Sequence, residues 1–199
     1  MKKSTVALTV VLGLLVVVGL AAAVVAFFYF AVTGISTEPA SDTQKRLVMN
    51  LESLDDYEVE LDAKCAKLTA KRNIDFTTEI EFEHDCESSS IYVSSTAEIA
   101  PTVRSARESF VLGIGAYKTG VAIGSGELEP RGELLTVGDQ RYGAIVRQNG
   151  APVGNVFVVR QGRVVHALLI TGIYFDDARD GDDLFKPLLE ESRRLFLPR

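Results

Sequence analysis

Residues 133–172 read ELLTVGDQRYGAIVRQNGAPVGNVFVVRQGRVVHALLITG, and three short turn signals divide this stretch into four apolar runs. The turns are Gly138-Asp139, Asn149-Gly150 and Gln161-Gly162, and Asn-Gly is among the strongest hairpin signals in a sequence. Strands joined by turns this short have to be antiparallel neighbours, so the stretch predicts a four-stranded meander. The run Val164–Ile170 is apolar on both faces apart from His166, which predicts a central strand and a structural histidine.

Residues 57–96 predict three further strands. Apolar and charged residues alternate from Tyr57 to Cys65 and again from Phe76 to Phe82, as on a half-buried strand, and a third strand follows at 91–96. The first two strands are expected to form a hairpin with its turn near Asn73. A tight turn there would pair Cys65 with Phe82, so a bulge or a longer loop is needed to bring Cys65 to Cys86.

The segment EFEHDCE, residues 81–87, raises the question of a metal site. The alternation places His84 and Cys86 on the apolar face of the strand and four carboxylates on the solvent-exposed face. Each carboxylate is then roughly 7 Å from the next one along the strand. Carboxylates at that spacing do not converge on one ion. We therefore interpret Glu81, Glu83, Asp85 and Glu87 as a charged strand face, with Lys64, Lys67, Lys71 and Arg72 as cross-strand partners.

Cys65 and Cys86 are the two cysteines of the chain, and both follow the apolar run at its N-terminus. One disulfide in an oxidising compartment is the favoured interpretation. Two buried free thiols remain the alternative. A redox pair is disfavoured because the close Cys-x-x-Cys spacing is missing. His84 has no third group to orient it, so we expect a structural histidine rather than part of a Cys–His dyad.

Helices are expected in three places. A possible capping box, Ser41 with Gln44, precedes leucines at helical spacing. A helix from Pro101 is expected to end at the glycine-rich residues 113–126, whose glycines fit neither a phosphate-binding loop nor a dinucleotide fingerprint. A closing amphipathic helix is expected to be capped by Asp182 or Asp183, with Pro187 near its start.

Five aspartates lie within residues 174–185. Their spacing does not match a calcium loop, which needs alternating ligands and a bidentate glutamate at the twelfth position. We expect a capped acidic loop and no metal site, and the weak candidates for metal ligands are Asp176, Asp177 and Asp180.

The N-terminal run from Val6 to Val32 carries no charge. At about 1.5 Å per residue it is roughly 40 Å long, enough to span a bilayer with tilt. A cleaved signal peptide is the alternative, but the run is longer than such a peptide needs and ends in bulky aromatic residues. Lys2 and Lys3 place the N-terminus in the cytoplasm. The predicted organisation is a cytoplasmic end at 1–5, a transmembrane signal anchor at 6–33, a tether at 34–46 and an exported domain at 47–199.

The exported part is acidic. All 27 acidic residues but only 19 of the 21 basic ones follow the anchor, which leaves a net charge of −8. This charge argues against nucleic acid and against anionic lipid surfaces as partners.

The order of elements, strands followed by a helix, a meander and a closing helix, predicts an α+β fold with helices packed on a curved antiparallel sheet. Over Tyr57–Phe196 this order, with the run RVVHALLITGIYFDD entering the last helix, resembles the Mog1/PsbP-like domains of bacterial envelope proteins. The resemblance implies an accessory or binding module rather than an enzyme, and it supplies no site residues.

We therefore expect a single-pass protein of the cytoplasmic (inner) membrane, with a non-enzymatic extracytoplasmic module that binds an envelope protein and needs no cofactor. In a eukaryote the same topology would face the secretory lumen. The alternative is a sensor or carrier of a metal or small molecule that uses the aspartates or the Glu81–Glu87 face. A hydrolase is disfavoured, because His84 and His166 would have to do all its acid–base work.

Overall fold

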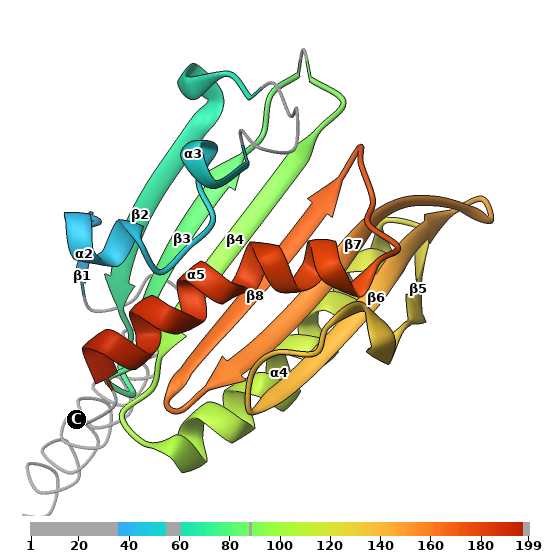
Figure 1. Cartoon of the computed structure of the whole chain (residues 1–199). Helices are drawn as coiled ribbons and strands as arrows, with labels where there is room; N and C mark the ends of the chain where they lie inside the picture. The colour runs from blue at the N-terminus through green and yellow to red at the C-terminus, as the bar shows by residue number, and fades with distance from the viewer. Residues whose placement is uncertain (1–35, 55–60, 88, 197–199) are drawn as a thin grey trace, which may run out of the picture.

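A computed structural model of the chain describes residues 36–54, 61–87 and 89–196. Eight antiparallel strands form one sheet in the order β1-β2-β3-β4-β8-β7-β6-β5, with helices on both faces (Figure 1). The strands are β1 (Ser36–Pro39), β2 (Ala66–Arg72), β3 (Thr78–His84), β4 (Tyr92–Ile99), β5 (Gly126–Pro130), β6 (Gln140–Gln148), β7 (Ala151–Gln161) and β8 (Val164–Thr171). The helices are α2 (Asp42–Lys45), α3 (Leu51–Leu54), α4 (Val103–Ile123) and α5 (Ala178–Phe196), with single 3₁₀ turns at Ala63–Cys65 and Gly132–Leu134.

The two long helices cover opposite faces of the sheet, as Figure 1 shows with α5 in front and α4 behind. Under α5 lies the larger core, which includes Phe157 and Phe185 with their rings 5.9 Å apart. Under α4 lies a smaller core that includes Phe110 and Val158. The expected α+β class is therefore confirmed.

The meander is present, but its first strand differs from the prediction. β6, β7 and β8 fall where the turn signals place them. The strand that pairs with β6 at the edge of the sheet is β5, and residues 133–137 form no strand. Leu134 and Leu135 lie instead in the core under α5, where both side chains are fully buried.

The N-terminal hairpin is formed by β2 and β3, and the register pairs Ala66 with His84. The longer loop that the cysteines require is present at residues 73–77. The prediction of a strand at 57–65 is wrong for residues 61–65. Asp62 accepts a hydrogen bond from the backbone N–H of Lys64 and starts a 3₁₀ turn at Ala63–Cys65. Residues 57–60 lie outside the described residues.

Both long helices extend beyond their predicted bounds. α4 continues through the glycine-rich residues, because Ile114, Tyr117 and Val121 keep packing on the sheet at helical spacing. α5 begins at Ala178, so Pro187 lies inside the helix and neither Asp182 nor Asp183 caps it. The many buried side chains of its amphipathic stripe compensate for the backbone hydrogen bond that proline cannot make.

The segment expected to be a tether is partly ordered. Ser36–Pro39 forms the edge strand β1 along β2, and Ser41 and Gln44 make the predicted capping box of α2. The predicted anchor lies outside the described residues. Within the described part of the chain, no helix is both long and apolar enough to cross a membrane.

Candidate functional sites

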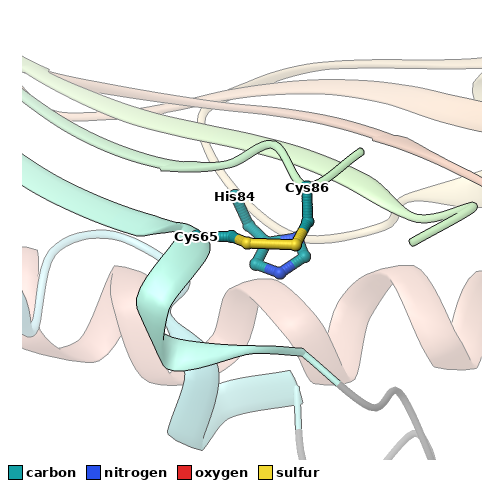
Figure 2. A group of neighbouring side chains, drawn as sticks. All are labelled: Cys65, His84 and Cys86. Carbon is teal, nitrogen blue, oxygen red and sulfur yellow. A yellow bond between two sulfur atoms is a disulfide. The ribbon is translucent and has the colours of Figure 1, made fainter. Parts of the chain in front are cut away.

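The Cys65–Cys86 disulfide is formed, with its two Cα atoms 5.3 Å apart. Cys65 ends the 3₁₀ turn before β2, and Cys86 lies just beyond the end of β3. Figure 2 shows the imidazole of His84 lying against the disulfide. A sulfur of each cysteine and a ring nitrogen of His84 all lie within 4.8 Å of one another, and this is the one group of three or more potential metal ligands among the described residues.

His84 is fully buried, and within the described part of the chain neither of its ring nitrogens has a hydrogen-bond partner. Its neighbours on the adjacent strands are Ala66 and Val93, which offer no polar side chain. Leaving a buried polar group without a partner costs free energy, on the order of 1–3 kcal/mol. The imidazole is therefore an unexplained polar group beside two sulfurs.

His166 shows how this protein accommodates a structural histidine. It is also buried, but Nδ1 lies 3.0 Å from the carbonyl oxygen of Leu47 and Nε2 lies 2.8 Å from Oγ of Ser192. Because a carbonyl oxygen only accepts, Nδ1 carries the proton and the Ser192 hydroxyl donates to Nε2. Burial lowers the pKa of His166 to about 4, although the Leu47 carbonyl acts in the opposite direction. The prediction of a structural histidine is confirmed here.

The carboxylates of residues 81–87 do not gather around His84. Glu81 lies on the face of the sheet that carries α4, opposite His84. Lys71, one of the expected cross-strand partners, forms its ion pair at 3.0 Å with Glu79, which lies before the segment 81–87. Burial, followed by the charges of Glu79 and Glu83, raises the pKa of Glu81. Burial also raises the pKa of Tyr117 on α4 to about 12. This side of the sheet is therefore a half-buried acidic surface.

The weak candidates Asp176, Asp177 and Asp180 are not assembled into a site within the described part of the chain. Asp177 accepts a hydrogen bond from the backbone N–H of Arg179, at 2.8 Å, in the first turn of α5. Their neighbour Asp182 is buried and accepts hydrogen bonds from the backbone N–H of Thr136, at 2.7 Å, and from its hydroxyl. Asp182 thus fastens α5 to the segment before β6.

A second candidate site is the outer face of α4, which consists of Leu112, Gly115, Ala116, Thr119 and Ile123. These residues recur at helical spacing on the side away from the sheet, and all are exposed. The side chains of Leu112 and Ile123 are 72% and 81% exposed, which marks an apolar surface that no other described residue covers. The sequence signal was present, since residues 111–123 contain a single charge, but ending the helix at 114 concealed it.

A hollow of about 440 Å³ opens beside the C-terminal turn of α4. Gly120 and Val121 line it from the helix, and Val146, Val153 and Leu169 line it from the strands. The outer face of α4 and this hollow adjoin at the same end of the helix.

Comparisons with known proteins give little guidance. No protein-family model matches the chain, and no curated protein sequence does. A solved structure with a similar arrangement is the extracellular domain of PknH from Mycobacterium tuberculosis, at 10% sequence identity and a TM-score of 0.40, over 80% of this chain and 82% of that one. A likeness this weak says nothing of what the chain does. The resemblance to Mog1/PsbP-like domains stays a prediction.

Proposed function

We propose that the protein is anchored in the cytoplasmic membrane by residues 6–33 and presents a non-enzymatic binding module on the extracytoplasmic side. The observation that carries this proposal is the apolar outer face of α4, which is exposed within the described part of the chain, with its adjoining hollow. The partner is an envelope protein that lays an apolar helix along this face and inserts a side chain into the hollow.

The chemistry of the surroundings favours a protein over a lipid surface. The sheet beside α4 carries a row of glutamates, and the exported part as a whole carries a net charge of −8. An anionic bilayer surface would be repelled by such a domain. An exposed apolar patch with a pocket at its edge, which a partner would desolvate on binding, is instead typical of the anchoring point of a protein interface.

The disulfide supports the extracytoplasmic location, because structural disulfides persist in oxidising compartments and are rare in the cytosol. The spacing along the chain supports a surface held near the membrane. The apolar run ends at Val32 and β1 begins at Ser36. A connection of three residues spans about 10 Å at most, so the domain and its partner would meet close to the bilayer.

A photo-crosslinking amino acid at Ala116, in the full-length chain expressed in its native membranes, tests the proposal. We expect a discrete protein adduct that disappears when Ile123→Glu places a charge on the same face. A crosslinker at Glu190, exposed on α5, is the matched control and should give no such adduct.

Three results would contradict the proposed partner. Adducts of equal yield at Ala116 and Glu190 would show that capture is unspecific. An adduct with lipid would make the face a membrane-contact surface, and an adduct with a second copy of the chain would make it a dimer interface.

A further inference from the structure

The cluster of Cys65, His84 and Cys86 is unexplained by the proposed binding function, because it lies on the sheet face opposite α4. A sulfur of each cysteine and a nitrogen of His84 lie within 4.8 Å of one another. His84 is fully buried and has no partner for either ring nitrogen among the residues that the structure describes, whereas the buried His166 has a partner for each nitrogen. The two buried histidines therefore differ: the ring nitrogens of His166 are hydrogen-bonded, and among the described residues those of His84 have only the two sulfurs as neighbouring donor atoms.

We propose that reduction of the Cys65–Cys86 disulfide converts this cluster into a binding site for a thiolate-preferring divalent cation of the zinc type. Two cysteine thiolates and a histidine nitrogen are a donor set that zinc uses where a fourth position stays open. Among the described residues no carboxylate joins the cluster, since Glu83 and its alternating neighbours lie on the other face of the strand. The donors are therefore soft, which disfavours magnesium and calcium.

The charge and exposure of the cluster fit such a cation. Two thiolates and one divalent cation sum to zero charge, so the loaded site leaves no net charge beside the buried imidazole. The cysteines are half-buried, in contrast to His84, so a water molecule would complete the coordination from the side of the sulfurs. Zinc–sulfur bonds of ~2.3 Å in tetrahedral geometry require the sulfurs to lie about 3.8 Å apart. Two Cα atoms separated by 5.3 Å allow this by rotation of the side chains.

The conversion balances as a two-electron exchange followed by a proton release. A dithiol reductant supplies two electrons and two protons and forms its own disulfide, while the sulfur–sulfur bond of Cys65 and Cys86 breaks and each sulfur becomes a thiol. Binding then forms two sulfur–metal bonds and one nitrogen–metal bond and releases both thiol protons to solvent. The disulfide and the cation exclude each other because both require the same two sulfur atoms.

The test compares the oxidised and reduced full-length chain in detergent, with Zn²⁺ as the probe. A phosphine reduces the disulfide and leaves no added thiol to compete for metal, and it is removed under anaerobic conditions. Native mass spectrometry counts the bound Zn²⁺, and competition with a chromophoric chelator gives its affinity. We expect one Zn²⁺ per reduced chain and none per oxidised chain, and Co²⁺ in its place should show sulfur-to-cobalt charge-transfer absorption.

Variants then identify the ligands. We expect His84→Ala to weaken Zn²⁺ binding to the reduced chain at least tenfold, and Glu83→Gln, the adjacent residue on the opposite face, to leave it unchanged. If His84→Ala fails to fold by circular dichroism, Cys86→Ser gives the same test by removing one sulfur ligand. The proposal is overturned if the reduced chain binds no Zn²⁺, if the oxidised chain binds it equally well, or if the folded ligand variant retains the wild-type affinity. None of these readouts involves the outer face of α4, so they stand apart from the test of the binding function.

Discussion

The buried imidazole of His166 makes the stability of the domain depend on pH in a way that a single substitution can isolate. Its pKa is lowered from the ordinary value of 6.5 to about 4 because the charged form would be buried. The unfolded chain therefore takes up a proton as the pH falls below 6.5, while the folded protein does not. The stabilisation is fully present above the unfolded pKa and is lost as the pH falls toward the folded pKa.

The magnitude follows from the two pKa values. Each unit of difference corresponds to about 1.36 kcal/mol, and integration from pH 7.5 to pH 4.5 gives a loss of about 2.5 kcal/mol in the free energy of unfolding. The protonated ring would also lose the hydrogen bond that the Ser192 hydroxyl donates to Nε2. Release of Ser192 would loosen α5 from β8, so the acid-induced change should begin at this contact.

Urea unfolding of the full-length chain in detergent, followed by tyrosine fluorescence at a series of pH values, measures this dependence. The matched variant is His166→Gln, in which a side-chain amide that can hydrogen-bond but does not titrate replaces the imidazole. We expect the wild-type curve to fall about 2.5 kcal/mol further than the variant curve between pH 7.5 and pH 4.5. Parallel curves for the two proteins would refute the reasoning, because they would mean that His166 titrates alike in the folded and unfolded states.

Two substitutions test how closely the elements are packed. Gly154→Ala would place a Cβ atom 2.0 Å from the carbonyl oxygen of Ile170 on the neighbouring strand, so we expect a loss of about 3 kcal/mol in urea unfolding. Gly132→Ala, whose Cβ would meet nothing within 4 Å, should change stability by less than about 1 kcal/mol, and equal losses for the two would contradict the packing. Asp182→Asn leaves at least one donor of Thr136 poorly matched, and we expect a loss of about 2 kcal/mol, with hydrogen exchange increased at the start of α5. Unchanged exchange there would show that Asp182 does not fasten the helix.

The meander was predictable because its information is local. Short turns specify which strands are neighbours, and positive φ angles at Asn149 and Gly150 match the turn that the Asn-Gly pair predicts. The alternation also predicted that Cys65 and Cys86 would meet, although Cys65 lies in a 3₁₀ turn before β2 and Cys86 lies beyond the end of β3. The structure confirms their pairing.

The bounds of the long helices were not predictable in the same way. Glycine inside a helix costs about 1 kcal/mol relative to alanine, and proline more, so local propensity favours an end near Gly113 and a start near Pro187. Burial against the sheet outweighs these penalties, and that burial exists only after the strands have assembled. Sequence reasoning also missed the exposed outer face of α4 and the lack of described hydrogen-bond partners for His84. Both depend on which residues become neighbours in the assembled fold.

The order of the strands also determines how the chain reaches this fold. Six of the seven pairings between the described strands join strands that follow one another along the chain, and the exception is β4 with β8, where Tyr92 lies beside Thr171. The two halves of the sheet, β1–β4 and β5–β8, can therefore each form from pairings between strands that are near in sequence. The pairing of β4 with β8 joins the halves, and it requires closure of the long loop between Ile99 and Val164 at an entropic cost. β8 is apolar apart from His166 and Thr171, and it remains an open edge until the two halves pair. It is therefore a segment at which a nascent chain is exposed to wrong association.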